Sequence, residues 1–232
     1  MRQNALCLSI LLFLLFITTL FLQFDYVNSR YIKYETAAGC KWCLDKERKD
    51  EGAFIPLSAT AASIAAPADR DFLADILWLK TALYFGEHAL TDKSYPYLAH
   101  LIDLITDLSP RWDYPYWFGV IILPMEADAV EDGLYFAEKA IIHHPDDWIF
   151  WFYKGFINFY YLNNAIEGAE ALYKASTLPQ GPKWLARLSA TLATKAGRKE
   201  LAIRFLEQSL EKVKDETQRK PILDKLEEVR AQ

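Results

Sequence analysis

The sequence from residue 70 onward is a succession of amphipathic segments, and no other feature of the chain constrains the fold as strongly. In each segment apolar residues recur every three or four positions, as on one face of an α-helix, and no alternation of strand type separates them. The connections are short, so consecutive helices are expected to be antiparallel neighbours. The sequence therefore predicts an all-α fold with helices at 70–89, 93–108, 113–124, 128–143, 147–162, 165–177, 182–196, 198–213 and 217–230.

Tryptophans and prolines in this region return at a nearly constant interval. Trp117 and Trp151 are 34 residues apart, Pro145 and Pro179 are also 34 apart, and Pro110 precedes Pro145 by 35. Two independent kinds of residue thus share one interval. Such an interval indicates an internal repeat in which each copy is a pair of helices.

One copy of the repeat begins at Tyr114. Trp117 then lies near the start of the first helix, Gly133 and Ala140 lie where small residues let the two helices touch, and Pro145 ends the unit. The same arrangement is expected for the copy that follows.

That second copy begins at Trp148 and has Trp151, Gly155 and Pro179 at the bulky, small and terminal positions. On the residues of these two copies the chain resembles the tetratricopeptide repeat family, over about residues 71–232. The resemblance implies an α-solenoid of antiparallel helix pairs, closed by the last helix as a cap. It also implies a scaffold that binds protein partners.

In this family a concave groove is lined by the outward face of the first helix of each unit. The resemblance therefore implies a groove for a helix or peptide, anchored by bulky apolar residues. Besides Glu126, the implied lining residues are Phe118, Ile122, Phe152, Phe156, Phe159 and Tyr160. Trp117 and Trp151 are expected to face inward. A competing interpretation is that the aromatic rings are core, because a bulky stripe at helical spacing is usually covered by neighbouring helices.

An uncharged stretch, residues 5–24, precedes the helical region. As a helix it would span about 30 Å, the thickness of bilayer hydrocarbon, so we expect a single transmembrane anchor. A cleaved signal peptide is the alternative, with Val27-Asn28-Ser29 as its cleavage site, although the apolar stretch is longer than a usual signal core. An anchor of this kind normally carries the rest of the chain outward, which predicts a periplasmic domain on the bacterial inner (cytoplasmic) membrane.

Residues 25–69 have few periodic apolar residues and are typical of a stalk or linker. Cys40 and Cys43 form a C-x-x-C pair there, which can close a local disulfide, exchange disulfides or supply half of a zinc site. Leu44 stands where haem attachment requires histidine, and the chain has no second C-x-x-C pair and no βαβ pattern. A local disulfide is therefore favoured over a redox or metal role.

Charge and motif content narrow the classes of function. Residues 71–170 contain 16 acidic and 5 basic residues, and the basic residues of 171–232 alternate with acids, so nucleic acid is not an expected partner. The chain has no nucleophile elbow, phosphate-binding glycine loop, zinc-protease motif or dinucleotide fingerprint. We predict neither catalytic nor metal-ligating residues, and no cofactor.

The remaining polar clusters have structural explanations. His143 and His144 fall at a helix end, where they can meet the last carbonyls. Asp146 and Asp147 fall at the next helix start, where a carboxylate accepts backbone N–H bonds. Acidic residues at 126–132 surround a turn whose spacing is not that of a calcium loop.

The chain is thus expected to have three parts: a membrane anchor at 1–24, a stalk at 25–69 and a helical domain at 70–232. The expected function is that of a membrane-anchored scaffold for a protein or peptide partner in a cell-envelope assembly or secretion machinery. The alternative is a membrane-tethered thiol protein that uses Cys40 and Cys43, as in cytochrome c maturation systems, which combine a periplasmic C-x-x-C pair with tetratricopeptide repeats.

Overall fold

The computed structural model describes residues 13–22, 58–65 and 69–231. The chain divides into two compact units, Met1–Ser58 and Ala59–Gln232. The second unit is therefore described almost completely.

The first unit is described as helix over residues 13–22. Within the described ranges, no helix combines the length and the apolar character needed to cross a membrane. The rest of the predicted anchor at 5–24, together with Cys40 and Cys43, lies outside those ranges.

The second unit consists of helices and turns, without a strand in the part that the structure describes. The all-α class predicted from the sequence is confirmed. In chain order the elements are α2 (Ala59–Ala65), α3 (Arg70–Leu90), α4 (Leu98–Leu108), α5 (Asp113–Glu126), α6 (Val130–His143), α7 (Trp148–Phe156), the π-helical turn η2 (Ile157–Tyr161), α8 (Ala165–Thr177), α9 (Trp184–Lys195), α10 (Lys199–Lys212) and α11 (Glu216–Ala231).

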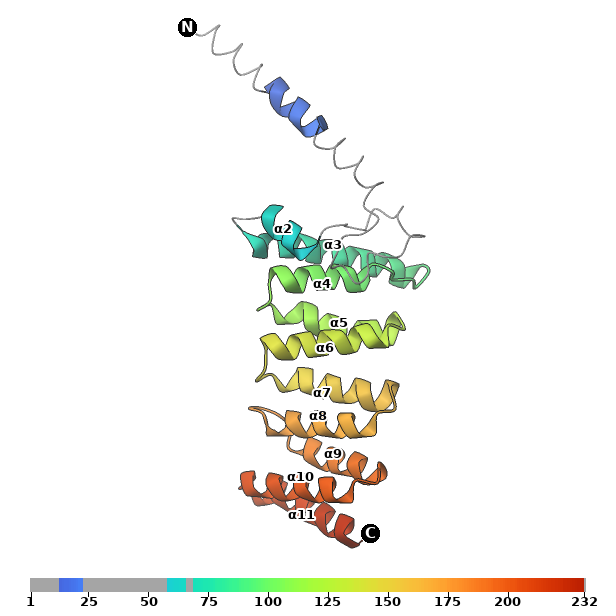
Figure 1. Ribbon diagram of the computed structural model, residues 1–232, viewed down its shortest axis with the longest axis vertical. Helices are drawn as coiled ribbons and strands as arrows, with labels where there is room; N and C mark the ends of the chain where they lie inside the picture. The colour runs from blue at the N-terminus through green and yellow to red at the C-terminus, as the bar shows by residue number, and fades with distance from the viewer. Residues whose placement is uncertain (1–12, 23–57, 66–68, 232) are drawn as a thin grey trace. The chain divides into compact units, whose positions relative to one another are not determined.

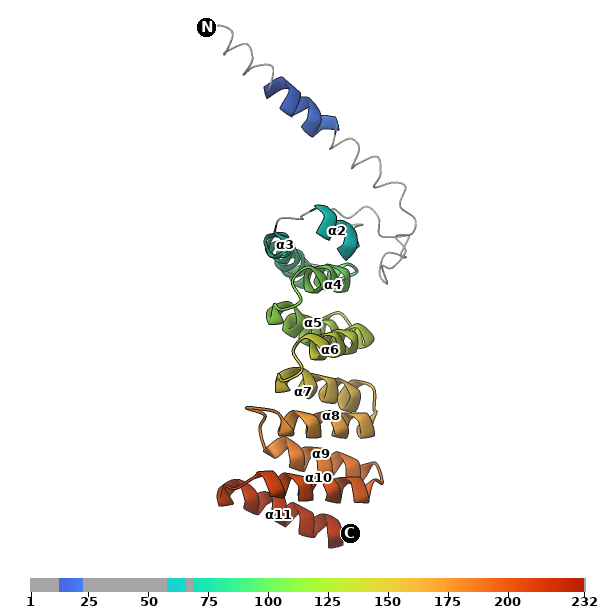
Figure 2. The ribbon, with the colours of Figure 1, turned by 60° about the vertical axis from the view of Figure 1, so that its left-hand side comes forward.

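Helices that are consecutive in the chain are also neighbours in space. From α3 to α11 they follow one another in chain order in both views (Figures 1 and 2). Helices α3, α5, α7 and α9 each pack against the helix that follows, and α4, α6 and α8 contact the first helix of the next pair. Helix pairs joined by short turns are therefore the building unit of this domain.

The bounds of the helices agree with the predicted ones to within two residues, except at the start of α4. This helix begins at Leu98 instead of residue 93, because Pro96 lacks an N–H and disfavours helical backbone at Tyr95. The short helix α2 falls in the segment that the sequence assigns to the stalk. Its Ala62 is buried, and the helix packs against α4.

The turn inside each of four successive helix pairs has the same left-handed residue. Lys93, Asp128, Asn163 and Gly197 have φ values of 55°, 52°, 54° and 74°, and they follow one another after 35, 35 and 34 residues. Of these, only glycine adopts such a φ without a steric cost. Recurrence of an uncommon backbone conformation at this interval indicates that the four pairs are built alike.

Hydrogen bonds repeat at the same interval. The Ala129 N–H donates to the Leu123 carbonyl at 2.9 Å, and 35 residues later the Asn164 N–H donates to the Asn158 carbonyl at 2.8 Å. These bonds satisfy the last carbonyls of α5 and η2, which have no partner inside the helix.

Glycines lie where the helices of a pair touch. A Cβ on Gly168 would lie 2.9 Å from the Cβ of Phe159, and one on Gly133 would collide with the ring of Pro124. These two contacts are also 35 residues apart. Gly155 approaches the Gly168 carbonyl in the same way from the other helix. The small residues predicted at Gly133 and Gly155 thus serve close helix packing.

The core continues from one helix pair to the next. Its largest completely buried side chains include Tyr116, Phe136 and Phe150, which lie in α5, α6 and α7. The buried residues of α8 to α11 form one cluster, which we call the C-terminal core; it includes Leu185 and Leu206. Each pair therefore buries its apolar face against its neighbours.

A polar network joins α4 to α6 beside this core. Lys139 Nζ lies 2.7 Å from Asp103 Oδ1 and 2.5 Å from Asp107 Oδ1, and it donates to Thr106 Oγ1 at 2.9 Å. The Tyr135 hydroxyl donates to Asp103 Oδ1 at 2.9 Å. Burial and then the nearby Asp103 carboxylate raise the pKa of Tyr135, so this hydroxyl keeps its proton at neutral pH.

Candidate protein-binding face on α5 and α7

Helix α7 and the π-helical turn η2 after it carry four of the six predicted groove residues, and α7 begins as the sequence indicates. The Asp147 carboxylate accepts the Ile149 N–H at 2.9 Å and caps α7, which confirms its predicted role. The indole N–H of Trp151 donates to the Pro145 carbonyl at 3.2 Å. These bonds fix the first turn of α7 against the loop before it.

Three of the predicted groove residues form a continuous line along α7 and η2, the aromatic row Phe152, Phe156 and Tyr160. Ring centroids of Phe152 and Phe156 are 6.3 Å apart with an interplanar angle of 19°. Those of Phe156 and Tyr160 are 5.2 Å apart and almost parallel, at 8°. Offset stacking of this kind stabilises the rings beyond their area of contact.

A π-helical turn carries the far end of the aromatic row. In η2 the Leu162 N–H donates to the Ile157 carbonyl, five residues back, at 3.1 Å. Asn158 is buried, and its side-chain amide donates to the Lys154 carbonyl at 2.9 Å, which provides a partner inside the widened turn. Single π-helical turns inside helices occur frequently at functional sites.

Exposure changes along the aromatic row. Phe152 is half-buried and packs against the C-terminal core, Phe156 is half-buried, and Tyr160 is 62% exposed. Phe152 thus contributes to the interior, as the competing core interpretation expects, whereas Tyr160 is exposed.

The other predicted groove residues do not lie in this row. Phe118 is half-buried and meets the rings of Trp78 and Phe85 of α3 edge-on, each at 5.2 Å between centroids. Phe159 is 37% exposed, and its Cβ lies against Gly168 of α8. Ile122 is half-buried in α5. The structure thus brings together half of the predicted set.

The repeat interval of the structure identifies further candidates. Helices α5 and α7 begin 35 residues apart, as do α6 and α8. With this interval, Trp117 corresponds to Phe152, Ile121 to Phe156, and Met125 to Tyr160. Met125 is 63% exposed, nearly the same as its counterpart. We call Ile121, Met125, Phe156 and Tyr160 the binding face.

Trp117 differs from the expectation. It is 38% exposed and stacks on Tyr114 with ring centroids 5.6 Å apart, so the prediction that it faces inward is wrong. Trp151 is half-buried, packs against the C-terminal core and has Lys174 Nζ 5.8 Å above its ring. The 34-residue interval between the two tryptophans therefore does not relate equivalent positions of the repeat, because Trp151 lies one residue before Phe152, the counterpart of Trp117. The 35 residues from Pro110 to Pro145 are the signal that gives the correct alignment.

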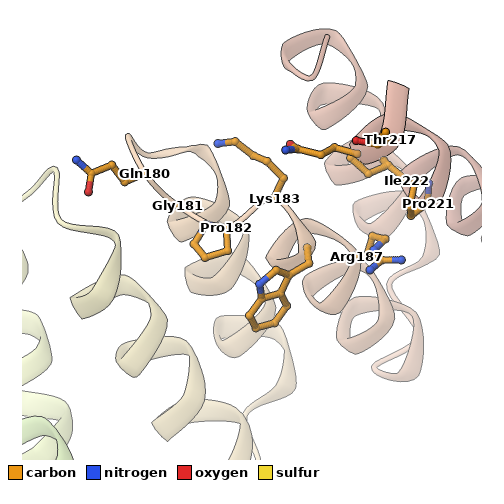
Figure 3. A pocket seen from close by; sticks show the side chains of 10 residues that line it. Gln180, Gly181, Pro182, Lys183, Arg187, Thr217, Pro221 and Ile222 are labelled. Atoms are coloured by element: carbon orange, nitrogen blue, oxygen red, sulfur yellow. The ribbon is translucent and has the colours of Figure 1, made fainter. Parts of the chain in front are cut away.

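Helix α9 is the first helix of the pair that follows α7 and α8, and its exposed side chains differ in chemistry from those of α5 and α7. Trp184, Arg187 and Lys195 are exposed on it. A pocket of about 540 Å³ lies where its first turn meets the first turn of α11 (Figure 3). Lys183 and Arg187 are the cations of its lining, which contains no acid, histidine or cysteine. Lys183 Nζ donates to the Ser176 carbonyl at 2.7 Å, and burial lowers the pKa of this lysine.

Other candidate chemistry in the described ranges is limited. Those ranges contain no group of three or more histidine, cysteine, aspartate or glutamate residues placed to hold a metal ion. His144 directly follows α6, at the helix end as predicted, and its backbone N–H donates to the Ala140 carbonyl at 2.7 Å. Its ring lies 5.6 Å from that of Tyr116, and among the described residues its buried Nε2 has no hydrogen-bond partner. The possible disulfide between Cys40 and Cys43 falls outside the described residues. No protein-family model matches the chain, and no curated protein is significantly similar to it.

Proposed function

We propose that this chain is a membrane-anchored α-solenoid of the tetratricopeptide repeat kind that binds a protein or peptide partner. Residues 5–24 would hold it in the bacterial inner membrane with the helical domain in the periplasm. There it would serve a cell-envelope assembly or secretion machinery. The observation that carries the proposal is the recurrence of one turn, one glycine contact and one exposed apolar position in successive helix pairs.

The chemistry of the binding face supports a protein partner. Met125 and Tyr160 expose a flexible thioether and a ring that has a polar end, and both groups are favoured where one protein anchors in another. The stacked Phe156 holds Tyr160 in place, so little side-chain entropy is lost on binding. An apolar residue of a helix or extended peptide could pack against these side chains.

The test is partner capture by crosslinking in membranes that contain the full chain. With Phe156→Ala plus Tyr160→Ala we expect at least a tenfold loss of the crosslinked partner, because truncation of an interface hot spot costs about 2 kcal/mol or more and tyrosine is enriched among hot spots. The matched control is Ile142→Ala, an exposed apolar residue of α6. It should leave capture unchanged.

Circular dichroism of each variant distinguishes lost contact from lost fold. A double variant that stays folded and captures its partner as well as wild type would exclude the binding face. Equal losses in the control and the double variant would also contradict the proposal, since they would mean that capture does not depend on this surface.

The alternative proposal is disulfide exchange by Cys40 and Cys43. In that reaction the Cys40–Cys43 disulfide would be reduced to two thiols while two thiols of a client are oxidised to a disulfide. A reduction potential as oxidising as those of exchange proteins, above about −230 mV, would favour this role. A value below about −300 mV is expected for a structural bond, which is the result that we predict.

A further inference from the structure

Helix α3 is apolar on two opposite faces. One face, Ala74, Leu77, Thr81 and Tyr84, is buried. The other has Phe72, Ile76, Leu79 and Leu83, which we call the α3 stripe; these four are 49% to 66% exposed. A second apolar face on a helix normally lies against another element, whereas the described residues cover only the opposite side of α3. The α3 stripe therefore has the composition of a contact surface.

The spacing within the α3 stripe is that of helix-to-helix contact. Its residues are separated by 4, 3 and 4 positions, the alternation found at the seam of a coiled coil. The separations are therefore symmetric about the point midway between Ile76 and Leu79. A two-fold axis at that point would place Phe72 opposite Leu83 of a second copy and Ile76 opposite its Leu79.

We propose that the α3 stripe is the interface of a homodimer in which two α3 helices pair antiparallel across this axis. The same surface meets itself in such a two-fold contact, so a palindromic stripe is self-complementary. Helix α3 is the first long helix of the second unit, and α4 packs against it (Figure 1). The α3 stripe lies on a different helix from the residues of the binding face, so the two surfaces can be varied separately.

The area of the α3 stripe determines how stable the dimer is expected to be. The exposed apolar area of the four side chains is about 400 Å² per copy, within the range of functional patches on monomers. A stable interface usually buries about 800 Å² per partner, so the flanking residues of α3 must contribute the rest. We therefore expect a reversible dimer whose population increases with protein concentration. The inference does not depend on the proposed partner or on the tetratricopeptide resemblance.

The first test is the mass of the full chain in detergent over a range of concentrations, measured by light scattering. Wild type should change from one chain to two as concentration increases. Leu79→Glu should weaken dimerisation at least tenfold, because two carboxylates would be buried near the axis. Ile142→Glu introduces the same change at an exposed residue of α6 and should leave the dimer intact.

The second test determines the direction of pairing. In a background with the three native cysteines replaced by serine, copies with Phe72→Cys are mixed with copies with Leu83→Cys and oxidised. Disulfide-linked dimers should form in the mixture, and neither variant should crosslink efficiently alone, since equal positions lie 11 residues, or about 16 Å, apart along the axis.

Several results would overturn the proposal. A chain that remains a monomer at all concentrations has no such interface. A dimer that persists with Leu79→Glu is formed by another surface. Efficient crosslinking of Leu83→Cys with itself means parallel pairing. If wild type remains a monomer, and a fluorophore on Leu83→Cys reports an apolar environment in phospholipid vesicles that Leu79→Glu abolishes, a lipid surface occupies the α3 stripe instead.

Discussion

Gly168→Ala is expected to lower the free energy of unfolding of the helical unit by about 2 to 3 kcal/mol, the upper range for overpacking a well-filled interior. The added Cβ would lie 2.9 Å from Phe159 Cβ and 3.1 Å from the Gly155 carbonyl oxygen. The second neighbour is backbone and cannot rotate away. The two helices of this pair must therefore separate or shift along one another.

Gly86→Ala is the matched control, because Gly86 is also helical and a Cβ there has no neighbour within 4 Å. This change should raise the free energy of unfolding by about 0.5 to 1 kcal/mol, since alanine favours helix over glycine. Urea titration of both variants in detergent, followed by circular dichroism, gives the two values. Equal stability of the two variants would mean that α7 and α8 do not approach as closely as the structure indicates.

Lys139→Met is expected to lower the free energy of unfolding by about 2 kcal/mol. Removing one member of a buried ion pair typically costs about 3 to 5 kcal/mol, and the partly exposed Asp107 reduces this figure. Without the ammonium group, Asp103 and Asp107 would repel each other between α4 and α6. The Tyr135 hydroxyl would remain the donor to Asp103.

The control for this prediction is Lys154→Met, which removes an ion pair with Glu138 of similar length, 2.8 Å, at a more exposed position. Its effect should be less than about 1 kcal/mol, as for most surface pairs. A double-mutant cycle with Asp103→Asn then measures the coupling between Lys139 and Asp103. Coupling near zero, or equal effects of the two lysine substitutions, would contradict a structural role for the network.

Periodicity was sufficient to predict the helices from α3 onward, because apolar residues recur at helical spacing along each one and local signals mark where helices start or end. Asp147 before α7 and Gly197 before α10 are examples of such signals. The start of α4 was predicted too early because apolar residues before Leu98 continue the pattern, whereas Pro96 interrupts the backbone. Helix α2 has only seven residues, too few for its period to be recognised.

The binding face was predicted only in part, for a different physical reason. Whether an aromatic residue is core or surface depends on which distant helix covers it, and sequence spacing carries little information on that point. Phe152 meets the C-terminal core, whereas Tyr160 at the same spacing is exposed. The network around Lys139 was missed because it joins residues 36 positions apart, each of which resembles an ordinary surface residue.

The 35-residue interval predicts that residues 113–143 and 148–178 superpose as two copies of one helix pair. An experimentally determined structure of the helical domain tests it directly, by superposing each residue of the first range on the residue 35 positions later. Both pairs should superpose, and Asp128 and Asn163 should coincide, each with a positive φ. Pairs that superpose only with another interval, or that differ in turn conformation, would contradict it.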